Sequence, residues 1–177
     1  IDPDEVHLTT RLAGDSTSFL PFNTGSAGPG AAGGSGNPPA GSAGYATAYL
    51  WEQIWQRDTW LDLLRRFAHL EATKGRTAAH ERKLIFPRFH QWHAVTELAA
   101  HVARHGSGHN YLVQHSAGSG KSNSIAWLAH RLSTLHTTAD PAALDPGAAE
   151  VGLGPDQLVF DKIIVVTDRS VLDKQLG

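Results

Sequence analysis

The pattern of apolar and polar positions predicts short extended segments at the start of the chain. Residues 5–12 (EVHLTTRL) alternate apolar and polar side chains, which predicts a strand. Residues 18–22 (SFLPF) predict a second short strand, in which Pro21 marks an edge or an end. Residues 23–44 are dominated by Gly, Ala, Ser and Pro, which bury too little surface to offset ordering entropy, so a surface loop or linker is expected.

Helical spacing occupies most of the middle of the chain. Residues 46–70 predict two helices, the second capped by Asp58, and their tryptophans favour packing over base stacking. A polar connector is expected over 72–82, a short extended piece at 84–87 (LIFP), and a helix over 89–105 that glycines end. The apolar positions expected to be buried in the first two helices are Tyr49, Leu50, Ile54, Leu61, Leu64 and Phe67, with Trp51 and Trp55 beside them.

The last third predicts a βαβ unit. Residues 110–115 (NYLVQH) predict a strand, 121–136 a helix, and 162–167 (KIIVVT) a strand buried on both faces, followed by a helix from about Asp168. This order predicts the α/β class, with a right-handed crossover that opens a doubly wound parallel sheet. Residues 137–158 are expected to form a long loop, and the buried face of the 121–136 helix is expected to comprise Ile125, Leu128, Ala129 and Leu132.

Composition narrows the class of protein only slightly. The 177 residues carry 15 Lys+Arg against 17 Asp+Glu, so no global basic excess requires nucleic acid as a partner. The absence of cysteine excludes disulfides and thiolate zinc sites. No signal segment opens the chain and no apolar run approaches the roughly 20 residues of a membrane span, so a cytoplasmic protein without a membrane partner is expected. A start at Ile1 rather than Met suggests a piece of a longer protein.

The strongest chemical signal is HSAGSGKS, residues 115–122. Gly118 and Gly120 allow a tight turn that points backbone N–H groups inward, Lys121 brings positive charge to the β and γ phosphates, and Ser122 offers a hydroxyl to Mg²⁺. The N-terminus of the following helix adds its dipole. His115 stands where the usual pattern begins with Gly, and we interpret it as a structural residue beside the loop. ATP and Mg²⁺ are the expected cofactors.

Two further segments resemble elements of superfamily 2 helicases. FPRFHQWHAV (86–95) places Gln91 where that superfamily reads adenine, and an amide carries both the donor and the acceptor needed; a solvated helix start is the alternative. IIVVTDRSVLDKQL (163–176) resembles the motif whose loop contacts the phosphates of a DNA strand, which would assign Thr167 and Arg169 to DNA binding.

Taken in order, these segments resemble the restriction (motor) subunit of type I restriction–modification enzymes. The resemblance also covers DEVHLTTRLAGDSTSFLPFN and the Trp-rich 36–67 region, and is most specific over 109–136. It implies an ATP-hydrolysing translocase and endonuclease that acts on double-stranded DNA with specificity and modification subunits. On the same resemblance the residues expected at ATP are Gln91, Ala117, Gly118, Ser119, Gly120, Lys121 and Ser122, the last two carrying the catalytic roles and Ser122 holding Mg²⁺.

The resemblance also implies a division of the chain. Residues 1–45 would be the edge of a nuclease domain with a glycine-rich loop, 46–82 a helical linker, and 83–177 the start of the first RecA-like motor domain. The nuclease carboxylates are expected before Ile1, and the DExH carboxylates, the arginine finger and the second RecA-like domain after Gly177. These residues alone are therefore not expected to hydrolyse ATP.

Other classes of protein remain open. In a small P-loop kinase or GTPase, Asp168 would be the Mg²⁺-linked carboxylate at the end of the last strand. In a non-catalytic docking module, the Trp-rich helices would carry the interaction. His101 and His105 have helical i,i+4 spacing without the glutamate of zinc hydrolases, and we interpret them as a solvated helix face.

Overall fold

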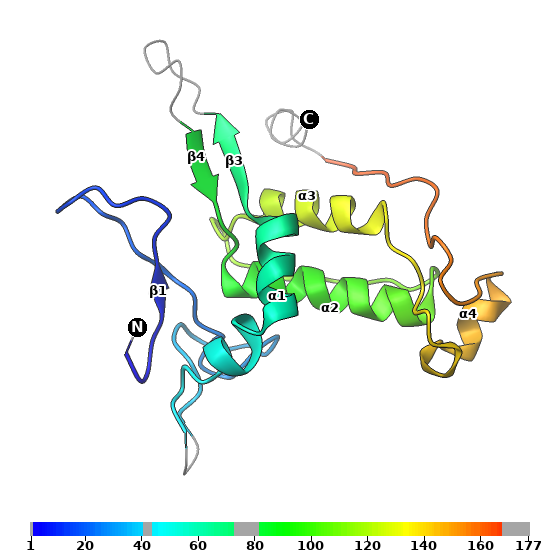
Figure 1. Ribbon diagram of the computed structural model, residues 1–177, viewed down its shortest axis with the longest axis horizontal. Coiled ribbons are helices and arrows are strands. Elements are labelled where there is room, and N and C mark those ends of the chain that lie inside the picture. Colours follow the sequence, from blue (N-terminus) through cyan, green and yellow to red (C-terminus); the bar gives the residue numbers. More distant parts are fainter. Residues whose placement is uncertain (1, 41–43, 73–81, 168–177) are drawn as a thin grey trace. The chain divides into compact units, whose positions relative to one another are not determined.

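The computed structural model describes residues 2–40, 44–72 and 82–167, which form two compact units, residues 1–93 and 94–177 (Figure 1). Within these ranges the strands form two antiparallel two-stranded sheets, β1–β2 and β3–β4. The chain is thus mixed α/β, but the parallel sheet predicted with this class is not seen in the described ranges. Whether a RecA-like sheet forms in the complete protein stays a prediction.

The first unit opens with the small sheet predicted from the alternating segments. β1 (His7–Leu8) pairs with β2 (Leu20–Pro21), in the register His7 opposite Pro21. The strands are much shorter than the 5–12 and 18–22 segments, and Pro21 ends one of them as expected for a residue without an N–H. Asn23 Oδ1 accepts from the N–H of Val6 at 2.8 Å, which continues the contact between the two segments.

Three consecutive helical pieces follow: η1 (Leu50–Ile54), α1 (Arg57–Asp62) and η2 (Leu63–Phe67). Gln56 is the N-cap of α1, so the prediction that Asp58 caps it is wrong; Asp58 lies in the first turn, where a carboxylate favours the helix dipole. The predicted burial of Leu50, Ile54 and Phe67 is confirmed, whereas that of Leu61 and Leu64 is wrong; in the π-helical η2 the buried leucine is Leu63. Leu50, Ile54, Leu63 and Phe67 are buried, whereas Leu61 and Leu64 are about half exposed.

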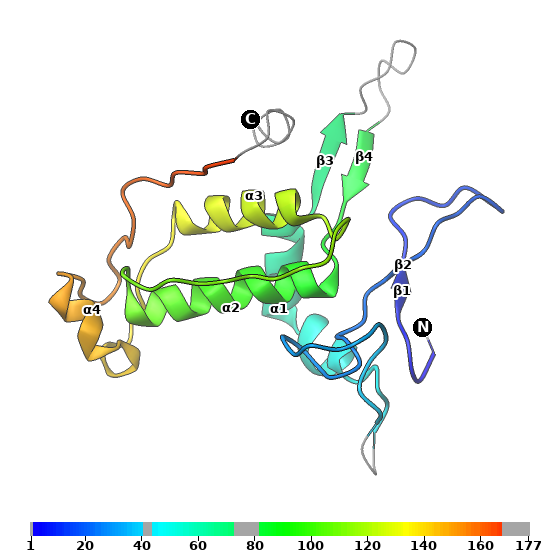
Figure 2. The same ribbon diagram turned by 180° about the vertical axis from the view of Figure 1, so that it is seen from behind.

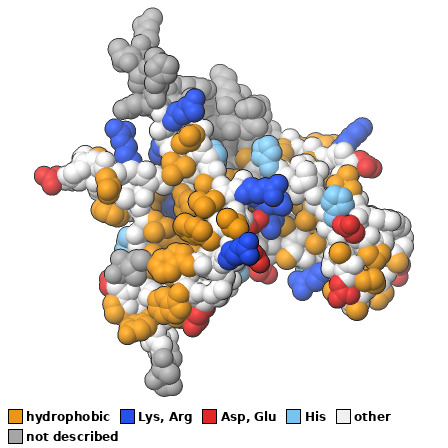
Figure 3. Space-filling view, in the orientation of Figure 1, with side chains coloured by type: hydrophobic (Ala, Val, Ile, Leu, Met, Phe, Trp, Pro, Cys, Tyr) orange, Lys and Arg blue, Asp and Glu red, His pale blue; other side chains and the backbone are white. Residues whose placement is uncertain are grey.

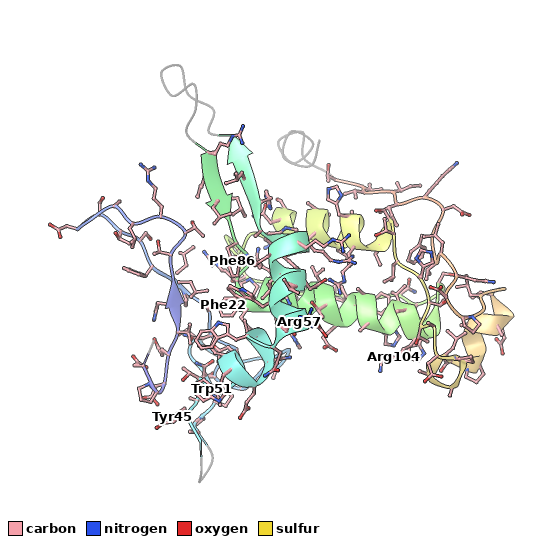
Figure 4. The ribbon with its side chains drawn as sticks, in the orientation of Figure 1. Phe22, Tyr45, Trp51, Arg57, Phe86 and Arg104 are labelled. Carbon is pink, nitrogen blue, oxygen red and sulfur yellow. The ribbon has the colours of Figure 1, made fainter. Side chains whose placement is uncertain are left out.

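Aromatic rings fill the core of the first unit. Phe89 is 1% exposed and its ring lies 5.8 Å from that of Phe22, 5.3 Å from Tyr49 and 5.4 Å from Trp92, all edge-on. The ring of Phe22 also contacts that of Phe86 at 6.2 Å (Figure 4). Rings packed edge-to-face bury large apolar area at favourable quadrupole geometry, so this cluster supplies much of the unit's stability.

The hairpin of β3 (His69–Ala72) and β4 (Arg82–Ile85) projects from the first unit, paired from His69 opposite Ile85 to Ala72 opposite Arg82 (Figure 1). The predicted connector over 72–82 lies mostly outside the described residues, but its ends are strands. Over the helical pieces, apolar side chains gather on the surface (Figure 3), including the exposed Trp51 and Trp55. Tyr45 lies edge-on to Trp51 at 6.0 Å (Figure 4).

α2 (Phe89–His105) is the longest helix and matches the sequence prediction at both ends. Gly106 follows it at φ +72° and donates its N–H to the carbonyl of Val102 at 2.8 Å, which is the left-handed helix end that glycine provides without strain. A Cβ at this position would lie 2.8 Å from Cδ1 of Leu153, so packing as well as φ requires glycine.

In the second unit the chain reverses after Gly106 and runs back along α2 toward α3 (Lys121–Leu132) (Figure 2). The predicted strands at 110–115 and 162–167 are not formed: both segments are extended without ladder partners in the described ranges. Leu112 is 91% exposed and Val166 is 89% exposed. A parallel pair requires partners distant in sequence, and those pairings are missing here.

The face of α3 differs from its prediction for the same reason. Trp127 is its buried residue, while Ile125 is 38% exposed and Leu128 is only partly covered. The predicted stripe was the one that would lie on the parallel sheet. Without that sheet, the indole of Trp127 is the side chain of α3 that is buried.

The two ends of the predicted loop at 137–158 are hydrogen-bonded to each other. Its ends meet where the N–H of Thr137 donates to the carbonyl of Gln157 at 2.8 Å and that of Val159 to the carbonyl of Leu135 at 2.9 Å. It contains η3 (Pro141–Ala143) and α4 (Pro146–Glu150), each preceded by an aspartate whose side chain caps it. Among the described residues, no helix is both long and apolar enough to cross a bilayer.

Candidate phosphate-binding loop

The glycine-rich segment forms a tight turn that leads directly into α3. The N–H of Ser119 donates to the carbonyl of Ser116 at 3.3 Å, and Ser119 is buried while its neighbours face solvent. Gly118 and Gly120 have φ of +74° and +80°, the left-handed region that the two glycines were expected to supply. Gly120 is the N-cap residue of α3, so the helix begins at Lys121 as predicted.

The N-terminus of α3 keeps its positive character. Its first turn contains no acidic residue, whereas His130 and Arg131 lie in its last turn, where cations suit the dipole. The first N–H groups of a helix have no carbonyl acceptor within the helix, so they point outward at the end of the glycine turn. An anion placed there would meet backbone donors and a favourable dipole.

Lys121 is folded over the loop that precedes it. Its Nζ donates to the backbone carbonyls of Ser116 at 2.8 Å and His115 at 3.2 Å. These bonds place the ammonium beside the turn rather than in bulk solvent. Phosphate oxygens, which carry full negative charge, are stronger acceptors than two peptide carbonyls, so the ammonium can exchange partners when an anion arrives.

His115 lies half-buried at the start of the loop, and its role as a structural residue stays a prediction. Desolvation, and secondarily the charge of Lys121, lower the pKa of its imidazole below the ordinary 6.5. The ring therefore stays neutral at pH 7 and adds no second positive charge beside Lys121.

The residues predicted to bind ATP fall into two groups in the structure. Ala117 through Ser122 are contiguous in the second unit, with Ser122 in the first turn of α3. Gln91 belongs to the first unit, 4% exposed at the start of α2, where its Oε1 accepts from the N–H of Arg88 at 2.9 Å. This is the returning half of a capping box, so the alternative of a solvated helix start is wrong.

The predicted DNA-contacting residues are only partly described. Thr167 is the last described residue of the second unit and is partly exposed. Arg169, and Asp168 of the kinase alternative, lie outside the described residues.

A cluster of imidazoles that the sequence analysis set aside is the second notable site. His101 and His105 stack at 4.0 Å between ring centroids, and His109 lies edge-on to them at 5.3 Å and 5.7 Å. The i,i+4 spacing indicated only the first contact, because the return of the chain brings in the third ring. In the described part of the chain no group of three or more His, Asp or Glu side chains is arranged to hold a metal ion.

No family model, curated protein or solved structure matches the chain.

The glycine turn gives a prediction that separates conformation from contact. A Cβ at Gly118 would meet nothing within 4 Å, so Gly118→Ala acts through its positive φ alone. We expect a loss of about 1 kcal/mol in the free energy of unfolding of the second unit, because a left-handed alanine is strained. Gly44→Ala is the matched control, since Gly44 also has open space but no left-handed φ. Chemical denaturation followed by circular dichroism measures both, and equal effects would contradict the assignment.

Proposed function

We propose that residues 115–122 bind the terminal phosphates of a nucleoside triphosphate, which places the chain among P-loop nucleotide-binding proteins. This proposal is carried by three features that meet at one helix end. Two glycines have left-handed backbone angles, the ammonium of Lys121 is bonded to the loop carbonyls, and the first turn of α3 contains no acidic residue. Each component favours phosphate, and together they favour a phosphate that also carries Mg²⁺ at Ser122.

Within that class, we propose that the chain is part of a type I restriction motor subunit, a cytoplasmic protein that hydrolyses ATP to translocate double-stranded DNA. The support is the resemblance of its segments in order, with Gln91 as adenine reader and Thr167 and Arg169 at the DNA backbone. Oε1 of Gln91 already accepts from the N–H of Arg88. Adenine would therefore bind to the remaining groups of the amide or replace that bond. Partner specificity and modification subunits, and the nuclease activity, belong to this proposal.

The test is ATP hydrolysis by the full-length protein assembled with its partner subunits, with and without duplex DNA. We expect hydrolysis that requires Mg²⁺ and rises on addition of long duplex DNA carrying the recognition site. A nucleoside or small acceptor that stimulates phosphoryl transfer while DNA has no effect would instead favour the small kinase. Binding of partners without any nucleotide binding would favour the docking module.

The DNA role is tested by Arg169→Ala. We expect weaker DNA binding with little change in ATP affinity, because a backbone contact contributes counterion release rather than nucleotide contacts. The slope of log affinity against log salt should fall in magnitude by about one unit. Lys162→Ala is the control in the same segment, since its exposed side chain is not assigned to DNA. An unchanged slope for Arg169→Ala would remove this residue from the DNA site.

A further inference from the structure

The three histidines at the end of α2 connect that helix to the segment that enters the phosphate loop. Besides the stacked rings of His101 and His105, Nδ1 of His101 lies 2.8 Å from the hydroxyl of Tyr111, whose ring stands edge-on at 5.4 Å. His109 contacts both α2 histidines edge-on. Residues 109–111 are thereby held along α2, four positions before the His115 carbonyl that binds Lys121.

The contacts around His101 are most favourable when its imidazole is neutral. Desolvation, then the positive charges on His105 and His109, lower the pKa of His101 below its ordinary 6.5. Burial raises the pKa of Tyr111, so its hydroxyl keeps its proton and can donate to Nδ1 of His101 in the neutral tautomer that carries its proton on Nε2. A proton on that Nδ1 reverses the direction of this hydrogen bond, so that the Tyr111 hydroxyl must turn to accept, and it places a cation against the stacked ring of His105.

The neighbouring charges do not offset this effect at His101. The carboxylate of Asp145 lies 3.2 Å from Nδ1 of His105, the ring stacked on His101. Asp145 raises the pKa of His101, but it is the smallest of the influences on that group. Arg104 lowers the pKa further. Arg104 lies near the end of α2 (Figure 4). Other ionisable groups on α2 and on the segment that returns to its end include Glu97, His136, Asp140, Glu150 and Asp156.

We propose that His101, stacked on His105, contacted by His109 and hydrogen-bonded to Tyr111, is a pH-sensitive latch that holds residues 109–111 on α2 and releases them when its imidazole takes up a proton. The sign follows from linkage: a histidine whose pKa is lowered by folding stabilises the folded arrangement when neutral, and this stabilisation is lost as pH falls through 6.5 and below. The latch itself needs no nucleotide. Its consequence, a looser entry to the phosphate loop at acidic pH, rests on the proposed function.

Limited proteolysis within residues 109–114, with a protease active at both pH values, tests the latch in the full-length protein without nucleotide and with EDTA present. After correction for the pH dependence of the protease on an unfolded peptide of the same sequence, we expect protection from cleavage to fall roughly fivefold from pH 7.5 to 5.5, an effect of the size that one weakened hydrogen bond produces. His101→Gln should remove this pH dependence. Tyr111→Phe should lower protection already at pH 7.5. His130→Gln, an exposed histidine on α3, should behave as wild type.

Two results would overturn the latch: protection in the wild type that is equal at both pH values, or a His101→Gln variant that keeps the wild-type pH dependence. Neither depends on ATP. The proposed nucleotide site is judged separately, by ATP binding at pH 7.5, where the latch is closed. Absence of ATP binding together with an intact pH response would therefore contradict the proposed phosphate site and leave the latch standing.

Discussion

Replacing Lys121 with alanine is expected to abolish ATP hydrolysis and DNA translocation by the full-length protein while leaving its fold intact. The ammonium is bonded to two of the loop carbonyls, and at the proposed site the transferred phosphoryl group would develop its charge beside it. Removing one such preorganised donor typically lowers the rate by about 10²–10³. The carbonyls of His115 and Ser116 lie near solvent, so water replaces the lost bonds at little cost.

The measurement is steady-state ATP hydrolysis with duplex DNA, together with circular dichroism to compare folds. Lys121→Arg keeps the charge but presents a planar fork in place of a compact ammonium, and it should recover only part of the rate. Lys162→Ala removes an exposed lysine of the same unit and should leave the rate unchanged. Hydrolysis at the normal rate in Lys121→Ala would show that this loop is not the phosphate site.

The largest effect on stability is expected from Phe89→Ala. Phe89 contacts the rings of Phe22, Tyr49 and Trp92, and its removal leaves a cavity that three rings on separate segments cannot fill together. Phenylalanine-to-alanine changes at buried sites cost about 3–5 kcal/mol, a large part of the roughly 5–15 kcal/mol that stabilises a domain. The first unit is therefore expected to be partly unfolded in this variant at 37 °C.

Urea denaturation followed by tryptophan fluorescence measures this change, since Trp92 is in contact with the altered site. Phe19→Ala is the matched control: Phe19 is 55% exposed, so the same chemical change should shift the free energy of unfolding by no more than about 0.5 kcal/mol. A similar small shift in Phe89→Ala would contradict the assignment of this ring to the core.

Local rules predicted the elements whose causes are local. The bounds of α2 followed from apolar spacing and from a glycine at its end, and the glycine turn followed from residue types that only a tight loop before a helix requires. The capping role of Gln91 had its own signal, a glutamine at the third position of a helix, whereas its assignment to adenine came from the family resemblance.

Elements that depend on distant partners were predicted less well. An apolar run such as 162–167 indicates a strand buried on both faces, yet Val166 and Ile164 are exposed because a strand exists only when a neighbour pairs with it. The stripe on α3 was wrong for the same reason. In the π-helical η2, Leu63 rather than the predicted Leu64 faces inward, and no propensity marks that departure.

The closed loop at 137–158 has a consequence for the order in which the second unit assembles. The N–H of Thr138 donates to the carbonyl of Ala103 and that of Asp145 to the carbonyl of Arg104, each at 2.8 Å, so the last turn of α2 receives its terminal partners from far along the chain. Such long-range bonds form only after the intervening segment has been brought back, which makes them late events in folding. The final turn of the longest helix is thus completed last, and it is the part expected to fray first on heating.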